Sequence, residues 1–314
     1  MYESQTTAPM FTPIHIEGEG SFGVVIKALD AEGNQVAVKK VKKAERYISR
    51  EMEVLQLISK IPQCIRLLNV FHSYDSQKRL MQNFVFEYMP TSLEKYLCQH
   101  AKAHKFIKNS QLRTIMEQIF MGLKSIHELG ICHRDLKPDN ILMNDALTIK
   151  ICDFGSAKII GKKEEGGNIT RIVARCYRPP EIVLTHPDYS YPVDMWTTGC
   201  ILLELMTLQT TFEARSDGLL FFEHCQLIGT PTLKEKEFLF KYTKDDIKLS
   251  LEKYIEQSKC DRVQIKNILP DFYSIEERKL AGDMIEKLLC WSPYDRLTAE
   301  KCLEHGFIKA FSNC

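Results

Sequence analysis

The chain reads ICHRDLKPDN over residues 131–140, and the tripeptide DFG begins thirteen positions after that stretch ends. A carboxylate such as Asp135 can accept a proton from a hydroxyl group, and the ammonium group of Lys137 can neutralise an anionic oxygen. The amide oxygen of Asn140 and the carboxylate of Asp153 are the hard oxygen ligands that Mg²⁺ prefers. Because Asp135 and Asn140 belong to one short loop, we expect a proton acceptor and a cation ligand to lie close together.

The composition limits the classes of protein to consider. A length of 314 residues suggests roughly two domains or lobes of about 150 residues each, and 44% hydrophobic with 26% charged residues is typical of a globular protein. The formal net charge of +1 gives no reason to expect a nucleic acid or a membrane surface as a partner. Residues 1–13 lack the apolar stretch of a secretory signal, and the most apolar run, residues 199–206, is too short to span a bilayer.

The cysteines indicate the compartment. There are eleven, an odd number, scattered from Cys64 to Cys314 without a CxxC pair. This pattern is typical of reduced thiols in an intracellular protein rather than of a disulfide framework. We therefore expect a cytoplasmic or nuclear location, or both.

The hydrophobic pattern changes near residues 88–90. Before that point, alternating and β-branched residues predict strands at 14–42, 65–72 and 83–88, with one helix at 44–60. After it, apolar residues recur at helical spacing and predict helices at 92–103, 110–129, 193–208, 217–228, 276–289 and 298–304. The pattern indicates an α+β protein with an N-terminal extension at 1–13, a small β-rich lobe at 14–89 and a larger, mainly helical lobe at 90–314.

A glycine-rich motif precedes the predicted third strand. Glycines let backbone N–H groups approach phosphates closely, and the motif lies between two strands, not between a strand and a helix as in a dinucleotide fold. We assign to it Gly18, Glu19, Gly20, Ser21, Phe22, Gly23 and Val25, with Phe22 capping the loop tip.

Two consecutive lysines follow at the end of the sequence VAVK. Successive residues of a strand point to opposite faces, so Lys39 shares the face of Ala37 and Lys40 does not. The sequence VAVK also resembles a family template that ends in a phosphate-binding lysine, so we choose Lys39 for that role and interpret Lys40 as a surface charge. Glu51, near the start of the next helix, is the best ion-pair partner for Lys39. The alternative is that Glu51 is an exposed carboxylate on the helix surface.

Together these motifs resemble those of the eukaryotic protein kinases, and the resemblance covers the chain from residue 18 to residue 296. It implies one bilobal protein kinase domain over about residues 14–308, ATP and Mg²⁺ as cofactors, and transfer of the γ-phosphoryl group to a hydroxyl of a protein substrate. Lys137 favours Ser and Thr over Tyr as acceptors, because tyrosine kinases usually carry Ala-Ala-Arg or Arg-Ala-Ala there.

The resemblance also implies the catalytic roles. Asp135 would accept or orient the hydroxyl proton, and Lys137 would neutralise charge on the γ-phosphate. Lys39 would hold the α- and β-phosphates, while Asn140 and Asp153 would bind the metal.

The adenine contacts follow from the strand that begins at Asn83. Phe86 is interpreted as the gatekeeper that closes the pocket behind adenine. The backbone of Glu87 and Met89 should bond the adenine edge.

Other residues are expected to act structurally. The ring of His133 should pack against Phe154, and Asp194 should brace the catalytic loop. Glu181 should form a buried ion pair with Arg296 and so fix the activation segment.

A narrower resemblance concerns the kinase group. Arg178 and the long segment between residues 212 and 270 are similar to the CMGC group, and the sequences GICHRD and ICDFGSAK look most like glycogen synthase kinase 3. That family binds a phosphate already present on its substrate with three basic residues, which map to Arg50, Arg134 and Lys158. Cyclin-dependent kinases carry a similar trio that binds their own phosphorylated loop, so that alternative, with a regulatory or scaffold partner, stays open.

Several positions depart from the family pattern. Arg171, preceded by Thr170, stands where glycogen synthase kinases have a phosphorylated tyrosine, and Ala174 stands where the group usually has Ser or Thr. Pro179 replaces the usual Ala. These departures leave the mode of regulation open. Ala174 is the only one that supports the alternative of a weakly active pseudokinase scaffold.

Overall fold

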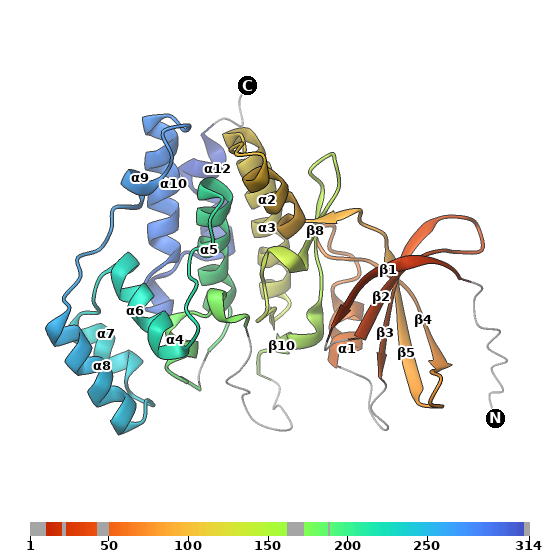
Figure 1. Cartoon of the computed structure of the whole chain (residues 1–314), viewed down its shortest axis with the longest axis horizontal. Coiled ribbons are helices and arrows are strands. Elements are labelled where there is room, and N and C mark those ends of the chain that lie inside the picture. The colour runs from red at the N-terminus through yellow and green to blue at the C-terminus, as the bar shows by residue number, and fades with distance from the viewer. Residues whose placement is uncertain (1–10, 21–22, 43–49, 162–172, 188, 311–314) are drawn as a thin grey trace. The chain divides into compact units, whose positions relative to one another are not determined.

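The computed structural model describes residues 11–20, 23–42, 50–161, 173–187 and 189–310 (Figure 1). The chain divides into two compact units, residues 1–90 and residues 91–314, and each is described by itself. The α+β fold class predicted from the sequence is confirmed, because the first unit is built on a sheet and the second is mainly helical.

The first unit contains a five-stranded antiparallel sheet with the strand order β1-β2-β3-β5-β4. Its strands are β1 (Thr12–Gly20), β2 (Gly23–Leu29), β3 (Gln35–Lys42), β4 (Leu67–Tyr74) and β5 (Leu80–Glu87). The turn between β2 and β3 uses Gly33, whose φ of 84° suits glycine. Asp30 stabilises this turn by accepting a hydrogen bond from the backbone N–H of Asn34.

The pairing register separates the two faces of this sheet. One face carries a buried apolar cluster of Ala28, Val36, Val38 and Val85. Directly paired residues share a face, so Ala37 lies beside Phe86 and Lys39 beside Phe84 on the other face. Lys40 belongs to the first face and is half-buried.

Of the helix predicted at residues 44–60, the structure describes α1 (Arg50–Leu57). Residues 43–49 lie outside the described part, and residues 58–60 form a turn and not the predicted last turn of the helix. Helix α1 buries Val54 and Leu55. The chain leaves the helix in a turn that includes a hydrogen bond from the N–H of Ile61 to the carbonyl of Ile58.

The second unit is organised around one buried helix. Its helices are α2 (Leu93–Lys102), α3 (Asn109–Glu128), α4 (Pro180–Val183), α5 (Pro192–Thr207), α6 (Asp217–Ile228), α7 (Leu233–Leu239), α8 (Asp245–Gln257), α9 (Ile265–Ile268), α10 (Ile275–Leu288), α11 (Ala299–Glu304) and α12 (Gly306–Lys309). Every residue of α5 from Val193 to Met206 is buried, and α5 packs against α3 and α10 (Figure 1). A helix that is apolar on all sides belongs in a core.

Two small sheets position the sequence motifs. Strands β6 (Thr91–Ser92), β8 (Ile141–Met143) and β9 (Ile149–Ile151) form one, and β7 (Ile131–Cys132) pairs with β10 (Lys158–Ile159) in the other. The HRDLKPDN loop therefore runs from β7 to β8, and DFG lies between β9 and β10. Helices α7 and α8 were not predicted; α7 begins with a capping box of Thr232 and Glu235.

Candidate active site

The loop between β7 and β8 is anchored by Asp194, in the first turn of α5. The Asp194 carboxylate accepts hydrogen bonds from the backbone N–H groups of His133 and Arg134, both 2.9 Å long, and lies 2.9 Å from His127 Nε2. Burial alone would raise the pKa of Asp194, but the hydrogen bonds and charges of His127 and His133 together outweigh burial and hold this pKa below its ordinary value. Asp194 therefore stays ionised and braces the loop, as expected.

His133 ties the same loop to the DFG segment. Its ring packs edge-on against Phe154 with centroids 4.9 Å apart, and its Nε2 lies 2.9 Å from the carbonyl oxygen of Cys152. His133 is fully buried. These contacts support a structural role for His133 and not a catalytic one.

Asp135 is held on both carboxylate oxygens. The backbone N–H of Ala174 donates to Oδ1 at 3.1 Å, and Asn140 Nδ2 donates to Oδ2 at 3.2 Å. Lys137 Nζ lies 3.5 Å from Oδ2. The missing Ser or Thr hydroxyl at position 174 therefore does not leave Asp135 without a contact from the activation segment, because the backbone of Ala174 supplies one.

Asn140 and Asp153 lie at the same end of the β8–β9 hairpin. The hairpin pairs Ile141 with Ile151, and the N–H of Cys152 donates to the carbonyl of Asn140 at 2.9 Å. Asn140 Nδ2 donates hydrogen bonds to Asp135, and the Oδ1 atom of Asn140 accepts no hydrogen bond from the described residues.

This donor set fits Mg²⁺. The ion is commonly held by one or two protein oxygens, with waters and substrate phosphates completing its shell. Among the described residues there is no group of three or more His, Cys, Asp or Glu side chains that could hold a metal by themselves. The pair of Asn140 and Asp153 therefore suits a metal that arrives with a nucleotide.

Three of the eight non-glycine residues with positive φ in the described part of the chain belong to the Asp135 loop or to segments that contact it. Arg134, Asp153 and Val173 have φ angles of 66°, 60° and 72°. A positive φ costs of order 1–3 kcal/mol and is a genuine outlier for a β-branched residue such as Val173. The carbonyl of Val173 accepts a 3.0 Å hydrogen bond from Arg178 Nε, which helps to hold this conformation. Such strain typically persists where function needs a fixed geometry.

In the first unit, the predicted ion pair between β3 and α1 is present. Lys39 Nζ lies 2.8 Å from Glu51 Oε1, and the two side chains are 12% and 13% exposed. Val25 pairs directly with Lys39 across the β2–β3 ladder. Lys39 is therefore oriented by Glu51 and remains reachable from outside.

The space available for a side chain differs between the glycines of the motif. A Cβ on Gly23 would lie 2.1 Å from the Lys40 carbonyl, and its φ is 117°, so packing alone requires glycine there. A Cβ on Gly18 would meet no atom within 4 Å. Glu19 and Gly20 complete β1 opposite Val24 and Gly23, whereas Ser21 and Phe22 lie outside the described residues.

The segment predicted to meet adenine ends β5. Phe86 is buried beside Ala37, and its ring stacks on Phe84 with centroids 6.2 Å apart. The N–H of Glu87 is bonded to the carbonyl of Arg66 at 3.1 Å. An adenine contact through Glu87 must therefore use its carbonyl oxygen, a restriction that the sequence did not reveal. Met89 follows this strand.

Two of the three predicted phosphate-binding residues meet at Tyr189. Arg134 NH1 donates to the Tyr189 hydroxyl at 2.9 Å, and Lys158 Nζ lies 5.2 Å from the centre of its ring. Arg134 also donates from Nε to the carbonyl of Ser156. The third, Arg50, is the exposed first residue of α1 in the other unit.

The end of the activation segment is firmly held. Arg296 forms two 2.7 Å hydrogen bonds to the carboxylate of Glu181, which is the predicted buried pair, and Arg178 NH1 donates to Asp217 at 2.8 Å. Thr170 and Arg171, which the sequence analysis placed in this segment, lie outside the described residues.

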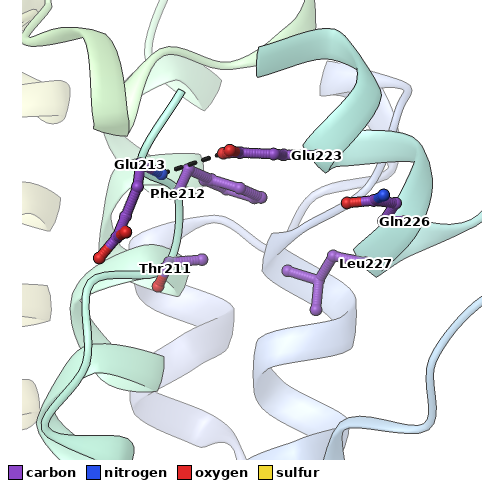
Figure 2. Close-up of a pocket in the computed structure, with 6 residues that line it drawn as sticks. All are labelled: Thr211, Phe212, Glu213, Glu223, Gln226 and Leu227. Atoms are coloured by element: carbon purple, nitrogen blue, oxygen red, sulfur yellow. Dashed lines mark hydrogen bonds between the residues drawn. The ribbon is translucent and has the colours of Figure 1, made fainter. Parts of the chain in front are cut away.

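A separate pocket of about 360 Å³ opens beside α6 (Figure 2). It is lined by Thr211, Phe212, Glu213, Glu223, Gln226 and Leu227. Glu223 shapes its rim by accepting a 3.0 Å hydrogen bond from the backbone N–H of Glu213. None of the predicted catalytic, nucleotide-binding or phosphate-binding residues lines this pocket.

Comparison with known proteins identifies the family. Residues 11–308 match the protein kinase domain, so the chain belongs to the protein kinase family. No helix among the described residues has the length and apolar character needed to cross a membrane.

Two relatives show how far the similarity extends. The chain is 33% identical over 296 residues to "Probable serine/threonine-protein kinase MRK1 homolog" of Encephalitozoon cuniculi (strain GB-M1), covering 94% of this chain and 86% of that protein. It is 30% identical over 295 residues to "Probable serine/threonine-protein kinase glkA" of Dictyostelium discoideum. That match covers 93% of this chain but 57% of the Dictyostelium protein, so the chain spans little more than half the length of this relative.

Proposed function

We propose that this chain is a serine/threonine protein kinase that transfers the γ-phosphoryl group of ATP to Ser or Thr hydroxyls of protein substrates, using Mg²⁺. The observation that carries the proposal is the catalytic loop, in which both Asn140 and Lys137 approach the carboxylate of Asp135. Asp153, at the same end of the β8–β9 hairpin as Asn140, completes the set. Membership of the protein kinase family supports it.

Each residue of the loop has a distinct task in this reaction. Asp135 orients the acceptor hydroxyl and takes its proton, and its contacts with Ala174 and Asn140 keep the carboxylate from rotating. Lys137 neutralises negative charge on the γ-phosphoryl group. Asn140 and Asp153 hold Mg²⁺, which when bound supplies positive charge to the phosphate oxygens. Catalysis then rests on positioning and electrostatics without a covalent intermediate.

The first unit supplies the nucleotide contacts. The glycine-rich motif from Gly18 to Gly23 offers backbone N–H groups to the phosphates, and Lys39, oriented by Glu51, binds the α- and β-phosphates. Val25 and Ala37 are assigned to the nucleotide site, and Phe86, Glu87 and Met89 to its adenine side.

The acceptor and the compartment are assigned from the sequence and from the named relatives. Lys137 at its place in the loop favours Ser and Thr, and both named relatives carry "serine/threonine-protein kinase" in their names. We assign the chain to the cytoplasm or nucleus from its odd number of scattered cysteines. The near-neutral composition continues to argue against nucleic acid as a partner.

A direct assay tests the proposal. The purified chain is incubated with Mg²⁺-ATP and three peptide libraries whose only acceptor is Ser, Thr or Tyr. We expect phosphate on the Ser and Thr libraries. ATP binding without transfer would favour the pseudokinase scaffold, and transfer only after a partner subunit is added would favour a cyclin-dependent-kinase-like enzyme.

We further propose that the enzyme resembles glycogen synthase kinase 3 in preferring substrates that already carry a phosphate. The support is the approach of Arg134 and Lys158 to the same residue of the second unit, Tyr189. Arg50 is the third cation that the family resemblance assigns to the phosphate. Charge-assisted hydrogen bonds to a phosphate would supply the preference.

The preference is testable with matched peptides. Peptides with a phosphoserine a few residues C-terminal to the acceptor should have a higher kcat/KM than their unphosphorylated versions, and Lys158→Ala should remove the difference. If the basic trio instead binds phosphorylated Thr170, the extra phosphoserine gives no advantage and Thr170→Ala lowers activity strongly. If the wild type has equal rates on both peptides, and Arg50→Ala changes the rate on neither, then the basic trio binds neither a substrate phosphate nor phosphorylated Thr170.

A further inference from the structure

A polar contact links two distant segments of the first unit. The hydroxyl of Tyr88 donates a 2.8 Å hydrogen bond to Glu17 Oε1 across 71 positions of sequence. His15 Nε2 lies 2.9 Å from the same carboxylate oxygen, and Lys27 Nζ lies 4.2 Å from the centre of the Tyr88 ring. Tyr88 is thus held at its hydroxyl by Glu17 and over its ring by a cation.

Both partners occupy informative places in the chain. Glu17 immediately precedes Gly18, and the β1–β2 register shifts between Ile16 and Gly18, which makes Glu17 the bulged residue. A bulge re-aims a side chain that would otherwise follow the alternation of the strand. Tyr88 lies between Glu87 and Met89, the two residues assigned to the adenine edge.

The charges at this contact favour a strong hydrogen bond. Burial, together with the hydrogen bond and negative charge of Glu17, raises the pKa of Tyr88 to about 12. The tyrosine therefore remains a neutral donor at every physiological pH. The charges facing the pair include the Glu17 carboxylate, the Lys27 ammonium and, when protonated, the His15 ring. A hydrogen bond to a charged acceptor contributes more than a neutral one.

We propose that the Tyr88–Glu17 hydrogen bond is a positioning contact that fixes the base of the glycine-rich motif to the adenine-binding segment and so sets the affinity for ATP. This inference rests on the proposed function, because it assigns the two segments to the phosphates and the adenine of one nucleotide. Gly18 has open space around its Cβ position, so packing at that position does not fix the motif. A contact one residue earlier restricts the motif before the ligand arrives and lowers the ordering cost of binding.

The test is Tyr88→Phe, which removes the hydroxyl and keeps the ring next to Lys27. The dissociation constant of Mg²⁺-ATP, measured by calorimetry on the full chain, should rise about tenfold, which corresponds to about 1.4 kcal/mol. The KM for ATP should rise in parallel while kcat at saturating ATP stays within about twofold, because Tyr88 touches no reacting group. Glu17→Ala should reproduce the effect, and Glu17→Gln, which keeps an acceptor oxygen, should show less of it.

Tyr74→Phe is the matched control. Tyr74 belongs to the same unit, at the end of β4, and is 71% exposed, so the same loss of a hydroxyl should leave the dissociation constant and KM unchanged. An ATP dissociation constant for Tyr88→Phe within twofold of the wild type would overturn the inference. So would a fall in kcat without a change in KM.

The inference and the proposed function fail in different ways. A wild-type chain that binds ATP but transfers no phosphate contradicts the proposed function, while the binding measurement on Tyr88→Phe still decides the inference. A wild-type chain that transfers phosphate with no change of ATP affinity in Tyr88→Phe contradicts the inference alone. A wild-type chain that binds no ATP overturns both.

Discussion

Asp135 and Asp194 are both buried carboxylates of the second unit, but their surroundings differ. Asp194 has a side chain that is 1% exposed, and its hydrogen bonds with His127, His133 and Arg134 are each 2.9 Å long. Asp135 has a side chain that is 11% exposed, with contacts of 3.1 and 3.2 Å. Short hydrogen bonds from the protein enclose the Asp194 carboxylate, whereas the Asp135 carboxylate remains accessible. This difference distinguishes a structural aspartate from one that a substrate can reach.

The two main ion pairs repeat the contrast. The side chains of Arg296 and Glu181 are 0% and 2% exposed, and Arg296 also donates to the carbonyls of Pro192 and Cys290. Lys39 and Glu51 keep 12% and 13% of their side chains exposed. Access to a ligand therefore distinguishes the pair assigned to catalysis from the pair that holds the fold.

The largest effect on stability is expected at Asp194. Asp194→Ala removes the acceptor of two buried backbone N–H groups, so the free energy of unfolding should fall by about 3–5 kcal/mol, measured by denaturant titration. Asp145→Ala, at an exposed position, is the control and should change it by less than about 0.5 kcal/mol. A loss under about 1 kcal/mol for Asp194→Ala would break the contrast with Asp135.

Asp153→Ala should affect activity rather than stability. Removing a carboxylate from the metal site should lower kcat by roughly 100-fold, about 2.7 kcal/mol, and raise the Mg²⁺ concentration that gives half-maximal activity. The measurement is kcat as a function of Mg²⁺ concentration, with thermal unfolding recorded on the same samples. An unchanged Mg²⁺ titration would contradict the assignment of Asp153 to the metal site.

Two glycine variants sharpen the distinction in the first unit. Gly23→Ala forces a Cβ against the Lys40 carbonyl and should cost about 2 kcal/mol of stability. Gly18→Ala, with open space at that position, should cost less than about 0.5 kcal/mol yet weaken ATP binding several-fold. Unfolding and ATP calorimetry on both variants check this. Equal stability losses would contradict the different roles.

A pH-dependent effect on stability concerns Glu204, which accepts hydrogen bonds from the Tyr177 hydroxyl and the Thr211 N–H. Burial raises the pKa of Glu204 from 4.5 to about 7. The unfolded chain loses this proton first, so the contribution of Glu204 to stability falls as the pH rises from about 4.5 to about 7. Glu204→Gln should flatten the stability profile over this range, and an unchanged slope would contradict the assignment.

The sequence predicted the elements whose signals are local. The limits of α6 agree with the prediction, and α3 and α5 lie one residue from theirs, because long apolar periodicity specifies a helix. Short α7 and the more polar α8 were missed, although the capping box of Thr232 and Glu235 was readable in the sequence.

Part of the site depends on features that sequence spacing does not encode. The contact from Ala174 to Asp135 comes directly after Val173, whose positive φ no residue type signals. The Tyr88–Glu17 bond joins residues 71 positions apart through a bulge. Family motifs indicated which residues to examine, but only the fold shows which backbone groups are already bonded, as at Glu87.

Asp135→Asn tests the central claim most directly, because it keeps the size and the hydrogen-bonding capacity of the side chain and removes its basicity. The measurement is single-turnover phosphoryl transfer to a Ser peptide at saturating Mg²⁺-ATP, with ATP affinity and unfolding measured on the same preparation. We predict a rate at least about 1,000-fold lower, near 4 kcal/mol, with ATP affinity within twofold and stability within about 1 kcal/mol of the wild type. A variant that keeps more than about a tenth of the wild-type rate, a cost below about 1.4 kcal/mol, would contradict the assignment of Asp135 as the base.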